Sequence, residues 1–311
     1  MLFEICYTKS WLRVKNYIEY IIFKFFVFLT NLLPFKVSQR LGKAFGIFAY
    51  YFIPYRKKVA LENLRKAFPE KDEKVLKQIL KMTYVNLAIT FFEFMSFPKL
   101  KADDLKKIAR FENLNYVYEG LSKGRGLILM SGHFGNWELN AVVTSLEIGK
   151  PLSIIVKTQR NRLVDKEINK WRCWFGNKVI PMERAFRESL KILSEGGIIA
   201  LLADQSAPKE GLYVNFLGRP ASTFAGPALM SLRTGAPIVM GFAVRDKNYN
   251  YRIIFEKVDF TPSGNESEDI FNLTQIHTSL LEKYVHLYPD HWLWFHRRWK
   301  HTPTHNLSPK R

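Results

Sequence analysis

Residues 125–140 read RGLILMSGHFGNWELN, and this stretch decides the fold predicted for the chain. The apolar run at 126–130 is typical of a buried strand, and a helix is expected to begin near Gly135. Because α/β sheets bind their ligands beyond the carboxyl ends of strands, His133 lies where a substrate is expected. The stretch thus predicts a strand, a helix and a candidate catalytic residue between them.

Similar apolar runs alternate with helical stretches in the sequence that follows. Further strands are expected at 151–156, 198–203, 238–243 and 251–260, and helices at 137–147, 161–174, 186–194, 224–233 and 266–288. This alternation predicts an α/β fold with a mainly parallel central sheet flanked by helices.

The first sixty residues have a different character, with apolar stretches at 17–34 and 41–54 beside basic residues. A spanning helix needs about 20 apolar residues, so buried helices and helices anchored in or lying on a membrane both stay open. Basic residues next to apolar helices favour an anionic bilayer surface. We expect membrane-associating helices at 1–58, an α/β domain at 59–300 and a polar tail at 301–311.

The formal net charge is +19, from 47 Lys and Arg against 28 Asp and Glu. Such a field attracts anionic lipid, nucleic acid or an acidic protein. Nucleic acid is not expected as a partner, because the sequence holds no zinc-finger, helix-turn-helix or RNP-like motif.

The two cysteines, Cys6 and Cys173, fit neither a disulfide framework nor a zinc site. This favours a reducing, cytoplasmic setting, and no metal is predicted. The first residues lack the layout of a signal peptide, so export is not expected.

His133 and Glu138 have a spacing that lets a carboxylate hold one imidazole nitrogen while the other accepts a proton. Seven histidines and 28 acidic residues in 311 positions give about 0.6 such matches by chance. His277 and Glu282 are indeed a second match, but a five-residue step within a helix separates side chains by about 140°, so they are not expected to meet. The turn at Gly135 frees the first pair from that restriction. The alternative is a His133 that caps or packs a turn.

Candidate polar side chains follow two other predicted strands. They are Arg160, Asn161, Arg162, Asp204, Gln205 and Lys209. An arginine there is suited to binding a phosphate or stabilising an oxyanion. The alternative is that it belongs to the solvent-exposed start of a helix. Asp204 either anchors an arginine or backbone amides, or simply caps a turn.

Three segments in order carry a family resemblance: RGLILMSGHFGNWE at 125–138, LLADQSAPKEGLYVNFLGRPASTFAGPALMSLRTGAPIV at 201–239 and YPDHWLWFHRRWK at 288–300. Together they resemble the bacterial lipid A biosynthesis late acyltransferases, the lauroyl and myristoyl transferase family, over nearly the whole chain. The family shares a His-x4-acid motif with the wider glycerolipid acyltransferase superfamily. That motif falls on His133 and Glu138.

The resemblance implies transfer of a fatty acyl chain from acyl carrier protein to a hydroxyl of a Kdo-bearing, lipid IVA-type precursor of lipid A. It implies a bacterial inner-membrane enzyme whose catalytic domain faces the cytoplasm, with no cofactor. His133 is then the general base, worth about 10²–10⁴ in rate, and Glu138 orients its ring. Oxyanion donors are expected from Arg160, Arg162 or amides near Gly135.

Asp204 and Gln205 match the family's Asp-Gln, a structural and substrate-positioning element. Ser206 follows them where many members have a second acid, and 156–160 lacks the family's Tyr-Arg-Pro-like turn. Both implied substrates are anions, so the net positive charge of the chain would attract them. The C-terminal Arg297, with its basic neighbours, is expected to bind headgroups, unless this aromatic segment packs on the core.

Two other enzyme readings stay open. An acyl-CoA-dependent acyltransferase acting on another glycolipid, such as a phosphatidylinositol mannoside, uses the same chemistry. A hydrolase pairing His133 with Ser131 is disfavoured because the sequence has no G-x-S-x-G elbow.

Overall fold

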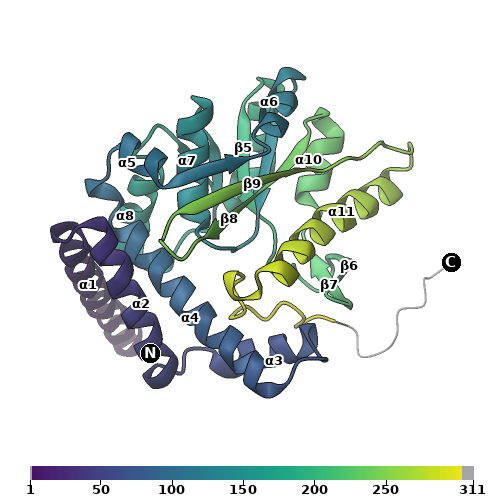
Figure 1. Cartoon of the computed structure of the whole chain (residues 1–311). Coiled ribbons are helices and arrows are strands. Elements are labelled where there is room, and N and C mark those ends of the chain that lie inside the picture. Colours follow the sequence, from purple (N-terminus) through teal and green to yellow (C-terminus); the bar gives the residue numbers. More distant parts are fainter. Residues whose placement is uncertain (1, 303–311) are drawn as a thin grey trace.

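In the computed structural model, which describes residues 2–302 and the side chains from residue 13 onward, seven strands form the central sheet (Figure 1). Their order is β1-β9-β8-β2-β5-β3-β4, and every neighbouring pair is parallel except β8 and β9. The strands are β1 (Ala109–Glu112), β2 (Leu127–Ser131), β3 (Ser153–Val156), β4 (Lys178–Pro181), β5 (Ile198–Leu202), β8 (Ile238–Arg245) and β9 (Tyr251–Lys257). The predicted α/β fold with a mainly parallel sheet is confirmed.

Helices cover both faces of this sheet, and further helices at the N-terminal end pack outside it. They are α1 (Leu2–Leu32), α2 (Phe35–Phe52), α3 (Lys57–Ala67), α4 (Glu73–Met95), α5 (Ala102–Lys107), α6 (Asn115–Ser122), α7 (Trp137–Ile148), α8 (Arg162–Arg172), α9 (Ala185–Ser194), α10 (Gly226–Thr234) and α11 (Glu266–Leu287), with short 3-10 turns η1 (Phe97–Lys99), η2 (Met182–Arg184) and η3 (Pro289–His291). Since side chains alternate along a strand, β2 contributes Leu129 to the core beneath α7 and Met130 to the core beneath α9, α10 and α11. The sheet thus separates two apolar cores.

The structure also contains elements that the sequence pattern did not predict. These are the edge strands β1 and β4 and the separate antiparallel hairpin of β6 (Leu212–Phe216) and β7 (Arg219–Thr223). The two edge strands have four residues each and carry charged side chains, so neither shows a clear apolar run. The sequence pattern also did not predict that β9 pairs with β8 in the antiparallel direction.

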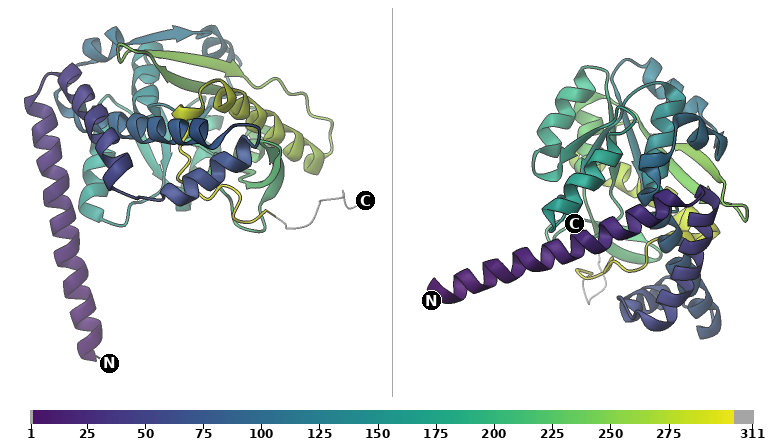
Figure 2. Two further views of the ribbon diagram at one scale, coloured as in Figure 1. Left: turned by 60° about the horizontal axis from the view of Figure 1, so that its bottom comes forward. Right: turned by 90° about the vertical axis from the view of Figure 1, so that its left-hand side faces the viewer.

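The N-terminal apolar stretches form α1 and α2, and α1 extends well away from the body of the molecule (Figure 2). On α2, a β-carbon at Gly46 would lie 2.5 Å from the Cα of Val85, so the small residue allows α2 to pack closely on α4. Among the described residues, no helix combines the length and apolarity needed to cross a bilayer. The membrane association of 1–58 stays a prediction, and the side chain of Cys6 and the tail residues 303–311 lie outside the described residues.

The turn between β2 and α7 lies directly against β8. Gly135 has a φ of 58°, in the left-handed region. A β-carbon there would lie 1.8 Å from the carbonyl oxygen of Ala243. Only glycine therefore fits, and the turn keeps His133 at the carboxyl end of β2.

A buried hydrogen-bond network supports the same turn. Glu93 of α4 is fully buried and accepts a bond of 2.7 Å from the side chain of Asn136, the residue that caps α7. Arg245 of β8 lies 3.2 Å from Glu93 and donates to the hydroxyl of Thr90. Thr90 in turn donates to the carbonyl of Gly135 at 3.1 Å. The turn is thus tied to α4 and β8 by buried polar groups.

We predict that Gly135→Ala lowers the free energy of unfolding by about 3 kcal/mol or more, because the new β-carbon meets backbone that cannot move aside. Urea unfolding followed by circular dichroism measures it. The matched control is Gly149→Ala, which has a φ of 65° but open space around it and should cost only about 1 kcal/mol. Equal losses in the two variants would contradict the packing argument.

Candidate active site

The imidazole of His133 is held by the carboxylate of Asp204, which follows β5. The His133 Nδ1 lies 2.8 Å from Asp204 Oδ1, and the backbone N–H of His133 donates to Oδ2 at 2.8 Å. The indole of Trp292 donates to the same Oδ2 at 2.9 Å. Asp204 therefore fixes both the ring and the backbone of His133 through Nδ1 and the N–H, and Nε2 points away from this carboxylate.

The charges around this pair shift both pKa values. Burial alone disfavours the imidazolium, but the charge and hydrogen bond of Asp204 outweigh it and raise the pKa of His133. Burial also opposes the Asp204 carboxylate, yet His133 and the two N–H donors lower its pKa to about 2. A protonated His133 is thus stabilised by a carboxylate that stays ionised.

Glu138 does not hold the ring of His133, which corrects the geometry expected from the motif. Its carboxylate instead makes a two-point ion pair with Arg172 of α8, with Nη2–Oε1 at 2.6 Å and Nε–Oε2 at 3.0 Å. The reason is that α7 begins at Trp137, so Glu138 lies in the first helical turn and faces α8. Glu138 acts on His133 only through its charge.

The C-terminal segment fastens the turn that carries His133. The N–H of Leu293 donates to the carbonyl of His133 at 3.0 Å, and the N–H of Gly135 donates to the carbonyl of His291 at 2.8 Å. The Gly135 amide is thereby occupied, so it does not serve as the oxyanion donor suggested by the sequence. The aromatic residues of this segment pack in the core, as the alternative reading of it predicted.

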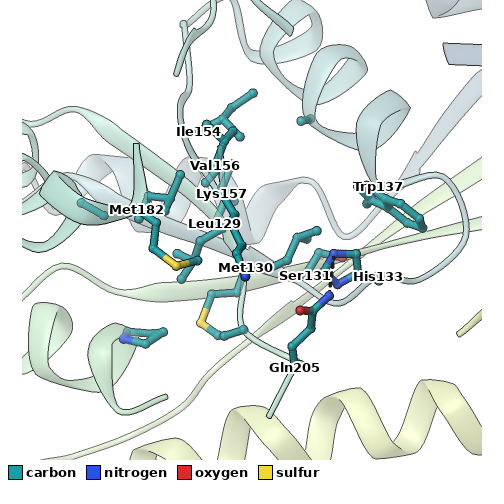
Figure 3. Close-up of a pocket in the computed structure, with 18 of the residues that line it drawn as sticks. Leu129, Met130, Ser131, His133, Trp137, Ile154, Val156, Lys157, Met182 and Gln205 are labelled. Atoms are coloured by element: carbon teal, nitrogen blue, oxygen red, sulfur yellow. Dashed lines mark hydrogen bonds between the residues drawn. The ribbon is translucent and has the colours of Figure 1, made fainter. Parts of the chain in front are cut away.

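A cavity of about 720 Å³ adjoins His133 and is lined mainly by apolar side chains (Figure 3). Trp137 meets the His133 ring edge to face, with centroids 5.1 Å apart. The amide nitrogen of Gln205 lies 3.4 Å from His133 Nε2. Nε2 of His133 is thus in hydrogen-bond contact with Gln205 at the edge of a space large enough for an apolar substrate.

The predicted site residues divide into two groups. Gln205 and Glu138 line the cavity, and Asp204 lies directly behind His133. Those that do not line it are Arg160, Asn161, Arg162, Lys209 and Arg297. Four of these are exposed cations, while the fifth is the buried N-cap of α8 and donates its side-chain amide to the carbonyl of Asn16.

Arg172 and His296 are cavity residues that were missed in the sequence analysis, whereas Lys157 and Lys300 lie in segments whose cations were expected to bind substrate. Arg172 lies within a predicted helix, and no motif in the sequence marked it as a site residue. His296 lies in the YPDHWLWFHRRWK segment, in which the sequence pointed to the basic residues next to it. Burial lowers the pKa of His296 to about 4, so this ring is neutral in the working range of most enzymes.

The second His-x4-Glu match stays apart, as predicted. His277 is buried in α11, and Glu282 accepts a hydrogen bond from the N–H of Leu217 at 2.7 Å. Its other oxygen lies 3.8 Å from His286.

Comparisons with known proteins identify the family of the chain. The family model described as bacterial lipid A biosynthesis acyltransferase matches residues 6–301. The chain is 23% identical over 272 residues to a lipid A biosynthesis acyltransferase of Haemophilus influenzae, covering 87% of this chain and 84% of that protein. It is 24% identical over 278 residues to the lipid A biosynthesis lauroyltransferase of Escherichia coli, covering 87% and 88%. A phosphatidylinositol mannoside acyltransferase of Mycolicibacterium smegmatis is 22% identical over 244 residues, covering 76% and 77%.

We predict that Asp204→Asn lowers the pKa of His133, because the amide removes the negative charge that stabilises the imidazolium. An NMR titration of the imidazole signals measures it. His277 is the internal control, since burial, reinforced by the charge of Arg298, lowers its pKa to about 3 in a place that the substitution does not touch. If the pKa of His133 is the same in the variant and the wild type, Asp204 does not stabilise the imidazolium.

Proposed function

Since this chain belongs to the bacterial lipid A biosynthesis acyltransferase family, we propose that it moves a fatty acyl chain from acyl carrier protein to a hydroxyl of a Kdo-bearing lipid A precursor. One observation carries the proposal. His133 has Nδ1 on a buried carboxylate and Nε2 beside a large apolar cavity. That is the arrangement of a general base next to the binding space of a lipid.

In the proposed reaction His133 Nε2 takes the proton of the acceptor hydroxyl while its oxygen attacks the thioester carbonyl. The tetrahedral intermediate collapses, the C–S bond breaks, and the thiolate receives the proton from the imidazolium. Asp204 stabilises that imidazolium and holds the tautomer with Nδ1–H. The raised pKa of His133 means that the base is lost as the pH falls through that pKa.

Arg172 takes the cationic role that the sequence analysis gave to Arg160 or Arg162. Arg172 lines the cavity, and its guanidinium donates two hydrogen bonds to Glu138, which fix it in place. A fixed guanidinium stabilises developing negative charge without having to reorganise. The exposed Lys157 and Lys300 also line the cavity and are suited to the anionic groups of donor and acceptor.

The hydrolase reading has little support in this geometry. The hydroxyl of Ser131 donates to the carbonyl of Gly241 at 2.7 Å. It is therefore engaged with β8 and not with His133. The mannoside-acyltransferase reading keeps the same base and differs only in its substrates, so the assay below includes acyl-CoA and a phosphatidylinositol mannoside.

We predict that His133→Ala lowers acyl transfer by about 10²–10⁴-fold, because no other group replaces the general base. The assay incubates acyl carrier protein loaded with acyl chains and a Kdo-bearing tetra-acylated precursor, with acyl-CoA and a phosphatidylinositol mannoside tested as the alternative donor and acceptor. Mass spectrometry reads the gain of one acyl chain. The control is His286→Ala, an exposed histidine on α11 that should keep wild-type activity. Undiminished transfer by folded His133→Ala protein would refute the mechanism.

We further propose that α1 and α2 hold the enzyme at the cytoplasmic face of the bacterial inner membrane. Apolar residues on α1 recur every three or four positions and are exposed, such as Ile21 at 64%, Phe25 at 59% and Phe28 at 62%. This spacing puts them on one helix face, which suits a helix lying in a bilayer interface.

Replacing Ile21, Phe25 and Phe28 together by serine should reduce partition onto vesicles of phosphatidylglycerol and phosphatidylethanolamine at least about ten-fold, since each side chain contributes about 1.5–3 kcal/mol when buried. Vesicle co-sedimentation measures it. Phe271→Ser with Leu287→Ser on α11 is the control, because it removes exposed apolar side chains elsewhere. Equal partition of both variants would rule out α1 as the membrane contact.

A further inference from the structure

The cavity beside His133 reaches both faces of the sheet, because two neighbouring strands separate there. Pairing between β3 and β5 ends at Ile154 and Ala200. Beyond that point β5 stays paired with β2 as far as Leu202, and β3 stays paired with β4 as far as Val156. An opening is left between the last residues of β3 and β5, and residues from both strands line the cavity.

One part of the cavity, the α7 lobe, lies between α7 and the sheet. Its apolar lining includes Leu129, Ala141 and Ile154, which pack with the core on that face. The polar atoms there are already paired, since Asn140 donates its amide to the Gly241 carbonyl at 3.0 Å and accepts from the Thr144 hydroxyl at 3.2 Å. An occupant finds few free polar partners, which suits a hydrocarbon chain better than a sugar.

The other part, the methionine lobe, lies on the opposite face beside α9 and α10. Its lining includes Met130, Ile155, Ala185 and Met230, which pack with the core on that face, and the exposed Met182. Figure 3 shows Met130 and Met182 on the side of the cavity away from His133 and Trp137. Thioether side chains adapt to flexible apolar ligands, so this lobe also suits a hydrocarbon chain.

The size of the cavity exceeds what one chain needs. A methylene group at the density of a packed interior occupies about 27 Å³. The volume of about 720 Å³ therefore holds roughly 26 such groups, or two chains of about a dozen carbons each.

We propose that the cavity binds two hydrocarbon chains at once, one on each face of the sheet, and that they meet at His133. The methionine lobe takes the acyl chain being transferred, and the α7 lobe takes the aliphatic tail of the acceptor's own hydroxyacyl group. This inference rests on the proposed function. It explains how one histidine reaches both a thioester carbonyl and a hydroxyl that sits on a second chain.

The position of α8 decides which lobe takes which chain. α8 borders the α7 lobe through Arg172, which contacts Glu138 of α7. On its other side α8 packs against α1, where the Phe23 and Trp171 rings stack with centroids 5.4 Å apart. A lipid acceptor arriving along the proposed membrane helix α1 reaches the α7 lobe first, and the donor carried by a soluble protein takes the lobe on the opposite face.

Two identical substitutions in opposite lobes test the proposal: Ala185→Leu in the methionine lobe and Ala141→Leu in the α7 lobe. Each adds three carbon atoms to the lining. Ala185→Leu should shorten the preferred donor chain by about two to four carbons and leave the KM for the acceptor within about two-fold. Ala141→Leu should raise the KM for the acceptor at least about five-fold, with recovery on an acceptor of shorter tail, and leave the preferred donor length unchanged.

The readouts are donor chain-length profiles and acceptor KM values, measured by mass spectrometry with the full chain. Ala185→Ser and Ala141→Ser are the controls that leave both lobes open, and thermal unfolding checks that each variant is folded; valine replaces leucine where a leucine variant does not fold. If both leucine variants shorten the preferred donor chain, or neither changes either readout, the two-chain assignment is overturned while the transferase activity of the wild type stands. A wild type that transfers nothing overturns the proposed function itself.

Discussion

The arrangement of this site depends on the carboxylate of Asp204. It accepts hydrogen bonds from the backbone and ring of His133 and from the indole of Trp292, and these three donors come from two segments far apart in the chain. A buried carboxylate without such donors is strongly unfavourable. The end of β5, the turn after β2 and the C-terminal segment must therefore assemble together, and the His133 geometry that we propose for a general base follows from that assembly.

A second buried charge supports the turn at Asn136, the residue that caps α7. Glu93 is paired with Arg245 and accepts from Asn136, so the start of α7 is fixed to α4 and β8. Breaking a buried pair by removing one partner typically costs about 3–5 kcal/mol. The turn is thus held between two buried acids that have different tasks: Asp204 sets the ring of His133, and Glu93 sets the backbone that carries it.

Sequence patterns were sufficient for the elements that carry long apolar runs and for the position of His133. The strand before it and the helix after it have clear periodicities, and the glycine at the turn marks the change between them. The same patterns could not predict which carboxylate holds the ring of His133. Asp204 lies 71 residues away, and only the pairing of β2 with β5 brings the two strand ends together. Short charged edge strands and the Arg172 contact had no local signal at all.

The motif acid Glu138 gains a physical role from this assembly that differs from orienting the ring. Arg172 lies in a cavity wall with little access to water, where an unpaired guanidinium is costly, and Glu138 offsets that cost with a two-point ion pair. Because Arg172 belongs to α8 and α8 packs against α1, this ion pair also joins the wall of the cavity to the helix proposed to lie in the membrane. The four residues between His133 and Glu138 therefore place Glu138 in the first turn of α7. It places one acid where α8 passes, while the task of stabilising the imidazolium falls to the acid at the end of β5.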